Sequence, residues 1–335
     1  MLTTPLRDAD TNFMTRTQAV PLLALAVILA SSCSNPPARA HLPSAGRQFP
    51  RTIRVQVAEE GNAVRRVSVE QYVHAAIISE FAPPSGDPAL IEQMFEVQAI
   101  VGRTYAIANP GRHARGGFDL CSTTHCQLYE PSRLKTSRWA GAAGEAVGRT
   151  AGVVLWHGRA PALALFNADC GGHTNTPENA WRGTSRPYLK AAPDDGLDAQ
   201  AHAAWHYEVS VREMLRALNT DARTRVGTRL DSISVVDRDA SGRAATVAIN
   251  GQQGRLVRGE DLRAILTRTF GARSVKSALF NIRRKDNVFI FDGIGFGHGV
   301  GLCQAGSVAR LRAGATPESV LRRYFPTTTL RSLRP

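Results

Sequence analysis

Apolar and polar positions follow a regular pattern from residue 52 onward, and they predict a chain of mixed strands and helices. Residues 52–59 alternate apolar and polar side chains, which is typical of a strand. Ser68 and Gln71 have the spacing of a helical capping box. The helix that follows has an apolar stripe made of Val69, Val73, Ala76 and Ile77. The next position on this stripe holds Glu80, so a carboxylate stands where a core residue is expected.

The remaining pattern predicts an α+β fold in which a small α/β subdomain is inserted. Asp87 and Pro88 predict the start of a second helix, because Asp favours the N-cap and Pro the first helical turn. A helical segment at about 138–147 and a hairpin of residues 152–156 and 160–168 follow. The predicted division is a signal peptide with lipobox (1–33), a flexible tether (34–51), a catalytic region (52–204), the inserted subdomain (205–285) and a C-terminal segment that completes the catalytic region (286–335).

The N-terminal residues have the features of an export signal. The apolar run 20–30 follows Arg16 and leads into Ser31, Ser32 and Cys33. Eleven residues are too few to span a membrane, and Met14 is an alternative start. We expect an exported periplasmic or cell-envelope lipoprotein, attached to the membrane only through a lipid on Cys33. The alternative is an ordinary signal peptide with an incidental cysteine.

Glu80 is the first candidate for chemistry. Burial on an apolar stripe raises the pKa of a carboxyl group, and a position in the last turn of a helix disfavours its negative charge. Both effects favour the neutral acid that cleavage of a glycosidic bond requires. The alternatives are that Glu80 pairs with a cation such as Arg103, or that it faces solvent.

A second cluster combines Cys121, His125 and Cys126. Two thiolates and an imidazole are zinc ligands, and the fourth would come from elsewhere in the chain or from water. The adjacent His125 and Cys126 bind one ion only if the chain turns there. The alternative is a disulfide between the two cysteines. The glycine-rich residues 293–301, which contain His298, lack the spacing of a dinucleotide-binding loop and favour a bent strand instead.

The net charge of +13 favours polyanionic partners. The basic residues are spread along the chain and form no tract. Nucleic acid is not expected, because no nucleic-acid motif is present and the predicted compartment does not hold it.

Four segments, taken in order, resemble the SpoIID/LytB family. They are Ser79-Glu80 with residues 96–106 (EVQAIVGRTYA), residues 118–129 (FDLCSTTHCQLY), Gly171-Gly172 through Trp181 to residues 188–190 (YLK), and residues 297–306 (GHGVGLCQAG) followed by 324–326 (YFP). The resemblance covers residues 55–330.

This resemblance implies a lytic transglycosylase that cuts peptidoglycan glycan strands, already stripped of peptides, and leaves 1,6-anhydromuramic ends. It implies that Glu80 is the acid/base and that a structural zinc is held by Cys121, Cys126 and His125, with no organic cofactor. The substrate-binding residues that we expect are Arg103, His173, His298 and Gln304. Two rivals are a non-catalytic glycan-binding protein that activates a cell-wall amidase, and a zinc hydrolase of peptide or amide bonds.

The sequence departs from the family pattern at three positions. Cys170 and Cys303 stand where the family usually has serine, and we expect a disulfide between them. His173 stands where the family more often has tyrosine, which affects substrate contacts.

Overall fold

The computed structural model describes residues 49–83, 87–194 and 202–333. The predicted signal peptide, Cys33 and most of the predicted tether lie outside these ranges. The described residues belong to one compact unit and form many short strands and helices, so the predicted α+β class is confirmed. In the described part of the chain, no helix has the length and apolarity needed to cross a membrane.

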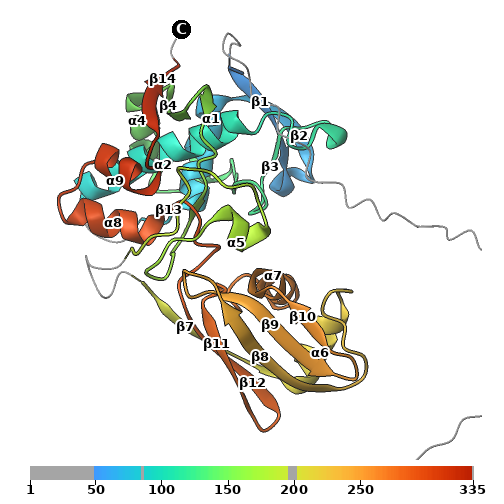
Figure 1. Ribbon diagram of the computed structural model, residues 1–335. Coiled ribbons are helices and arrows are strands. Elements are labelled where there is room, and N and C mark those ends of the chain that lie inside the picture. Colours follow the sequence, from blue (N-terminus) through green and yellow to red (C-terminus); the bar gives the residue numbers. More distant parts are fainter. Residues whose placement is uncertain (1–48, 84–86, 195–201, 334–335) are drawn as a thin grey trace, which may run out of the picture. The chain divides into compact units, whose positions relative to one another are not determined.

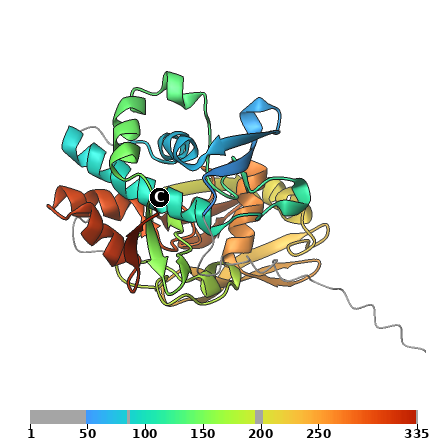
Figure 2. The same ribbon diagram turned by 90° about the horizontal axis from the view of Figure 1, so that it is seen from above.

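The first hydrophobic core combines residues before position 190 with residues after 299. Its central helices are α1 (Val69–Glu80) and α2 (Pro88–Ala108). In both views the red helices near the C-terminal end, α8 and α9, lie beside the cyan helix α2 (Figure 1, Figure 2). The other elements of this part are β1 (Thr52–Val57), η1 (Ala58–Glu60), β2 (Ala63–Ser68), η2 (Ala114–Gly116), β3 (Leu120–Cys121), α3 (Arg133–Thr136), α4 (Ala140–Arg149), β4 (Val153–His157), β5 (Ala160–Pro161), β6 (Phe166–Asn167), α5 (Pro177–Trp181), β13 (Leu302–Cys303), α8 (Gln304–Arg312), α9 (Pro317–Tyr324) and β14 (Thr329–Ser332).

Local sequence signals explain where the two central helices begin. The Ser68 hydroxyl accepts the N–H of Gln71, and the Gln71 side chain accepts the N–H of Ser68, so the predicted capping box is confirmed. The Asp87 carboxylate accepts the N–H of Ala89 at the start of α2, with Pro88 in its first turn. These caps determine where α1 and α2, the helices on which the site is built, begin.

A second hydrophobic core lies between Trp205 and Phe291. One sheet has the order β10-β9-β8 and the other the order β11-β12-β7, with antiparallel pairing throughout. The elements are β7 (Ala204–Ser210), α6 (Val211–Asn219), β8 (Leu230–Arg238), β9 (Ala244–Gly251), β10 (Arg255–Val257), α7 (Gly259–Phe270), β11 (Phe280–Lys285) and β12 (Val288–Ile294). The inserted subdomain was predicted to end at residue 285. In the structure the second core extends further along the chain, because it buries Phe289 and Phe291 of β12.

The predicted hairpin of residues 152–156 and 160–168 is only partly present. β5 ends at Pro161, and β6 pairs in parallel with β13 instead. This pairing joins residues more than 130 positions apart, which no local pattern reveals. β2 was also not predicted, because three of its six residues, Val64 to Arg66, are exposed and give no alternation.

The glycines of the 293–301 segment are required by close packing. Gly299 and Gly301 have φ angles of 78° and 76°, which favour glycine. A Cβ atom at Gly299 would overlap the Arg243 guanidinium, and one at Gly301 would overlap the carbonyl oxygen of Leu165. The expected close approach of backbone to other groups is therefore present here.

Candidate functional site

Glu80 is the last residue of α1 and is partly buried. Its Oε1 accepts the backbone N–H of Leu128 at 2.5 Å. Burial raises the pKa of Glu80 to about 7, although the Leu128 N–H lowers it, and the nearby charge of Glu130 raises it further. The carboxyl group is therefore close to half-protonated at neutral pH, a state that suits a group which gives and takes a proton.

The segment that follows β3 is fastened to the end of α1 by several hydrogen bonds. The N–H of Glu130 donates to Ser79 Oγ at 3.0 Å. Tyr72 donates its hydroxyl hydrogen to Gln127 Oε1 at 2.9 Å, and this pair is buried. Together with the Leu128 contact, these bonds fix the orientation of the Glu80 carboxylate.

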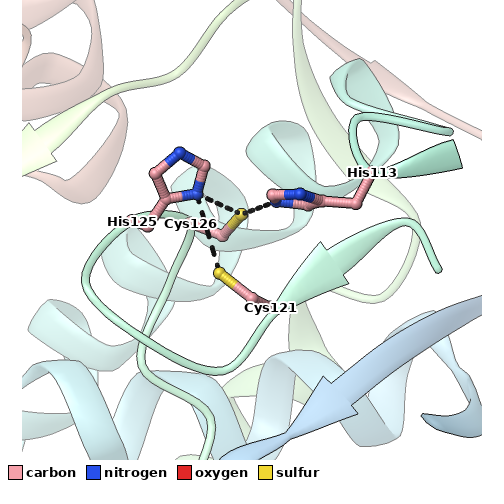
Figure 3. Close-up of side chains that lie close together, drawn as sticks. All are labelled: His113, Cys121, His125 and Cys126. Carbon is pink, nitrogen blue, oxygen red and sulfur yellow. Dashed lines mark hydrogen bonds between the residues drawn. The ribbon is translucent and has the colours of Figure 1, made fainter. Parts of the chain in front are cut away.

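Four possible metal ligands meet at the start of this segment (Figure 3), which we call the surface cluster: His113, Cys121, His125 and Cys126. Their ligand atoms all lie within 4.8 Å of one another. His113 Nε2 is 3.2 Å from Cys126 Sγ, and His125 Nδ1 is 3.6 Å from the same sulfur and 3.7 Å from Cys121 Sγ. The turn that His125 and Cys126 require is closed by a hydrogen bond from Cys126 N–H to Thr123 O at 3.0 Å.

The donor set of the surface cluster fits zinc. Two sulfurs and two imidazole nitrogens at these spacings suit a tetrahedral Cys2His2 site. The hydrogen bond between the two thiols lowers the pKa of Cys121 and raises that of Cys126, so the pair shares one proton that a bound zinc ion would displace. Both cysteines have free thiols in this structure, so they are not joined to each other. Sequence reasoning left the fourth ligand open, and His113 fills it from eight positions upstream of Cys121.

Gln304 contacts the main chain of Glu80. Its amide nitrogen is 3.4 Å from the carbonyl oxygen of Glu80 and 3.3 Å from Gln98 Oε1. Both glutamines are buried. The contact joins the first turn of α8 to the end of α1, so Gln304 supports the backbone at Glu80.

Arg103 does not line the site. It is 1% exposed, and its guanidinium donates to the Glu70 carboxylate, at 2.6 Å for the shortest contact. It also contacts the carbonyl oxygens of Val147 and Val153. The expected role in substrate binding does not fit this burial, because Arg103 instead holds α1, α2 and α4 together. The alternative pairing of Glu80 with Arg103 is likewise absent.

The two histidines of the predicted site occupy different surroundings. His298 packs against Trp181 with a centroid distance of 4.6 Å, and burial lowers the pKa of His298 to about 3. Trp181 is 43% exposed. His173 is partly buried, and its Nδ1 lies 2.7 Å from the carbonyl oxygen of Thr174. The exposed indole beside a neutral imidazole is a surface on which a sugar ring can stack.

Cys170 and Cys303 lie together, and both are buried. Cys303 Sγ accepts the N–H of Cys170 at 3.2 Å. The sulfurs are not bonded to each other in this structure, where both cysteines are free thiols. The disulfide between them stays a prediction.

Two further carboxylates lie in the chain segments next to the surface cluster. Asp119 binds the Arg54 side chain at 3.1 Å and the N–H of Gly111 at 3.0 Å, and although burial raises its pKa, these hydrogen bonds lower the pKa overall. Asp119 is therefore an ionised structural group. Glu130 is paired with Arg133 at 2.9 Å, and it was not singled out from sequence because no motif carries it.

Residues 58–157 match the family model described as Stage II sporulation protein. The chain is 30% identical to an uncharacterised protein of Brachyspira hyodysenteriae over 266 residues, which cover 78% of this chain and 66% of that protein. The chain belongs to the SpoIID/LytB family. It is 24% identical to Stage II sporulation protein D of Bacillus subtilis over 281 residues, which cover 80% of this chain and 76% of the relative.

Two other matches of this SpoIID/LytB chain concern its function and its second core. An amidase enhancer of Bacillus subtilis is 24% identical over 284 residues, which cover 72% of this chain but only 38% of that protein. Residues 197–301 match a second family model, described as a domain of unknown function (DUF8618). This match spans the elements of the second hydrophobic core.

Proposed function

We propose that this protein cuts peptidoglycan glycan strands by lytic transglycosylation, with Glu80 as the single acid/base. Protonated Glu80 gives its proton to the glycosidic oxygen as the bond between C1 of N-acetylmuramic acid and that oxygen breaks. The Glu80 carboxylate then takes the proton of the muramic C6 hydroxyl, whose oxygen bonds to C1. The products are a free N-acetylglucosamine end and a 1,6-anhydromuramic end.

The observation that carries this proposal is the environment of Glu80. A pKa of about 7 lets one carboxyl group act as acid in the first half of the reaction and as base in the second. A hydrolase with two carboxylates would use a second group to activate water. Of the two nearby acids, Asp119 is engaged by Arg54 and Glu130 by Arg133. The intramolecular attack needs neither.

Charge and exposed aromatic surface support a polyanionic glycan as substrate. A strand stripped of peptides carries one free lactyl carboxylate on each muramic acid, and the chain carries a net charge of +13. Trp181 offers an exposed ring for stacking. The segment from His298 to Gln304 connects the residue that packs against Trp181 with the residue that supports the Glu80 backbone, so Trp181 and Glu80 would border one glycan path.

We propose that the surface cluster holds one structural zinc ion. His113, Cys121, His125 and Cys126 would fill all four tetrahedral positions, which leaves none for a substrate or for water. The ion would supply rigidity: Leu128, whose N–H contacts Glu80, follows Cys126 by two residues. A closed site also argues against the zinc hydrolase alternative.

The membrane attachment is proposed from the sequence. Lipidation of Cys33 after export would place the protein at the cell envelope, where peptidoglycan is found.

A second candidate function rests on the similarity to the amidase enhancer. In this reading the protein binds glycan strands and stimulates a cell-wall amidase without cutting the strands. The pKa of Glu80 would then have no catalytic consequence.

The test uses peptide-stripped glycan strands and mass spectrometry of the products. Wild-type protein is compared with Glu80→Gln and with a matched control, Glu92→Gln, which changes an exposed carboxylate on α2 that is paired with Arg149. We expect 1,6-anhydromuramic ends from wild type and the control, and a loss of about 10² to 10⁴-fold in Glu80→Gln. If no protein produces these ends while all three bind the strands, the amidase-enhancing function is favoured.

A further inference from the structure

A second group of possible metal ligands lies in the interior, and we call it the buried cluster: Asp169, Cys170, His202 and Cys303. Their ligand atoms lie within 4.8 Å of one another. Both cysteines are inaccessible, Asp169 is 6% exposed, and His202 is partly buried. Three separate segments supply them: the loop after β6, the residues before β7, and the N-cap of α8. None of the four belongs to the surface cluster.

The donor atoms are those that zinc selects. Two sulfurs, one imidazole nitrogen and one carboxylate oxygen form a tetrahedral set. For zinc bonds of about 2.0 to 2.3 Å, neighbouring ligands of a tetrahedron lie roughly 3.3 to 3.8 Å apart. The observed spacing therefore needs only small side-chain shifts to enclose an ion.

The partners of His202 match those of a ligating histidine. Its Nε2 lies 3.2 Å from the carbonyl oxygen of Asp194, an acceptor that assigns the hydrogen to Nε2. Its Nδ1 then faces Asp169 Oδ1 at 2.6 Å. Without a metal ion this contact is an ion pair, because the hydrogen bond to Asp169 raises the pKa of His202 to about 9, and a bound cation would take the place of the proton on Nδ1. The N–H groups of Gly171 and Ala203, each at 2.8 Å, orient the Asp169 carboxylate.

Two backbone N–H groups orient the sulfur of Cys303. Its sulfur accepts the N–H of Cys170 at 3.2 Å and that of Gly306 at 3.3 Å. Cys303 is also the N-cap residue of α8, so the position of its sulfur is fixed by the start of that helix.

The charges around the buried cluster allow a divalent cation. Cys170 donates its thiol hydrogen to Asp194 Oδ2 at 3.2 Å, and metal binding would displace this hydrogen. Asp194 would keep its partners, because it is paired with Arg310 at 2.6 Å and accepts the Tyr324 hydroxyl. Two thiolates and the Asp169 carboxylate would carry three negative charges, one more than a divalent cation neutralises. Arg243, whose guanidinium donates to the Cys170 carbonyl oxygen at 2.6 Å, offsets that remaining charge.

We propose that Asp169, Cys170, His202 and Cys303 form a second divalent-cation site, suited to zinc, in addition to the surface cluster. The bound ion would join the loop after β6, the entry to the second core and the start of α8. Gln304 follows Cys303 and contacts the Glu80 backbone, so the ion would also fix the support behind Glu80. The proposal does not depend on the reaction that Glu80 performs.

The experiment isolates the buried cluster in a protein that lacks the surface one. Full-length protein with Cys121→Ser and Cys126→Ser is stripped of metal under reducing conditions and loaded with cobalt. We expect one cobalt per chain and the absorption of tetrahedral cobalt with thiolate charge transfer. Adding Cys170→Ser and Cys303→Ser, serine being the residue that the family resemblance implies at both positions, should abolish this spectrum without a change in circular dichroism.

Metal analysis of the otherwise intact protein gives a second readout. We expect two zinc ions per chain in wild type and one in Cys170→Ser/Cys303→Ser. Equal zinc content in these two proteins would overturn the proposal, as would a Cys170–Cys303 disulfide found by peptide mapping of freshly purified protein. If the protein with Cys121→Ser and Cys126→Ser does not fold, the zinc content of wild type and of Cys170→Ser/Cys303→Ser tests the proposal alone.

Discussion

The surface cluster and the buried cluster have similar ligand chemistry but are built in different ways. Three ligands of the surface cluster lie within six residues, and the fourth, His113, is eight positions upstream. The buried cluster combines residues up to 134 positions apart, from Asp169 to Cys303. Most of the surface cluster lies within one loop, whereas the buried cluster requires the pairing of β6 with β13. The surface cluster is therefore expected to control Glu80 directly, and the buried cluster to control it through α8.

Removal of the surface cluster is the strongest way to test this difference. We expect Cys121→Ser/Cys126→Ser to lose one zinc ion and about 10²-fold in glycan cleavage, because the Leu128 N–H no longer holds the Glu80 carboxylate in place. Metal analysis and product assays measure both effects. The matched variant Cys170→Ser/Cys303→Ser should lose less activity, and an equal loss in both would contradict the direct role of the surface cluster.

The pH dependence of cleavage reports on the same contact. In the proposed reaction Glu80 begins as a protonated acid, so kcat/KM should fall about tenfold per pH unit above its pKa of about 7. The hydrogen bond from the Leu128 N–H lowers the pKa of Glu80. Its loss in Cys121→Ser/Cys126→Ser should therefore raise this pKa and move the pH profile of that variant to higher pH. A rate that is constant from pH 6 to pH 9 would show that Glu80 is not the proton donor.

Glu80 should also lower stability at alkaline pH. Its pKa is about 7 in the folded protein and has an ordinary value of 4.5, so the folded state holds the proton more tightly. Stability is therefore lost as pH rises from 4.5 to 7 and stays lower above that range. We expect Glu80→Gln to be more stable than wild type by about 1 to 3 kcal/mol at pH 8, with a smaller difference at pH 5, in denaturant unfolding. The same advantage at both pH values would point to a change in packing instead.

The smallest expected effect is that of the neighbouring charge. Glu130→Gln removes a charge that raises the pKa of Glu80. We expect the alkaline limb of the activity profile to move down by about half a pH unit, with an unchanged maximum rate. Glu145→Gln, an exposed change on α4, serves as control. A large drop in the maximum rate would assign Glu130 a direct role in the reaction.

Much of the local structure could be predicted because it depends on neighbouring residues. The capping box at Ser68 and the start of α2 at Pro88 follow from side chains within one helical turn. The place of Glu80 on the buried stripe follows from helical periodicity. The turn that brings His125 and Cys126 together is also local.

Arg103 shows where residue type misled the prediction. A conspicuous arginine in a family motif suggests contact with an anionic substrate, yet its guanidinium lies in the core beside Glu70. Only the packing of α4 against α1 and α2 creates the carbonyl acceptors that bury it. The prediction also assigned residues 286–294 to the catalytic region. In the structure β12 pairs with β11 and with the distant β7, and this pairing places it in the second core.

The sequence by itself determined where α1 and α2 begin, the place of Glu80 on the apolar stripe and three residues of the surface cluster. These features depend on backbone geometry over a few residues, which a linear pattern records. The tertiary structure alone decided that His113 completes the surface cluster, that Gln304 supports Glu80, and that Asp169 and His202 join Cys170 and Cys303. These contacts depend on which distant segments of the chain pack against one another. The free energy that decides this packing comes from the whole core.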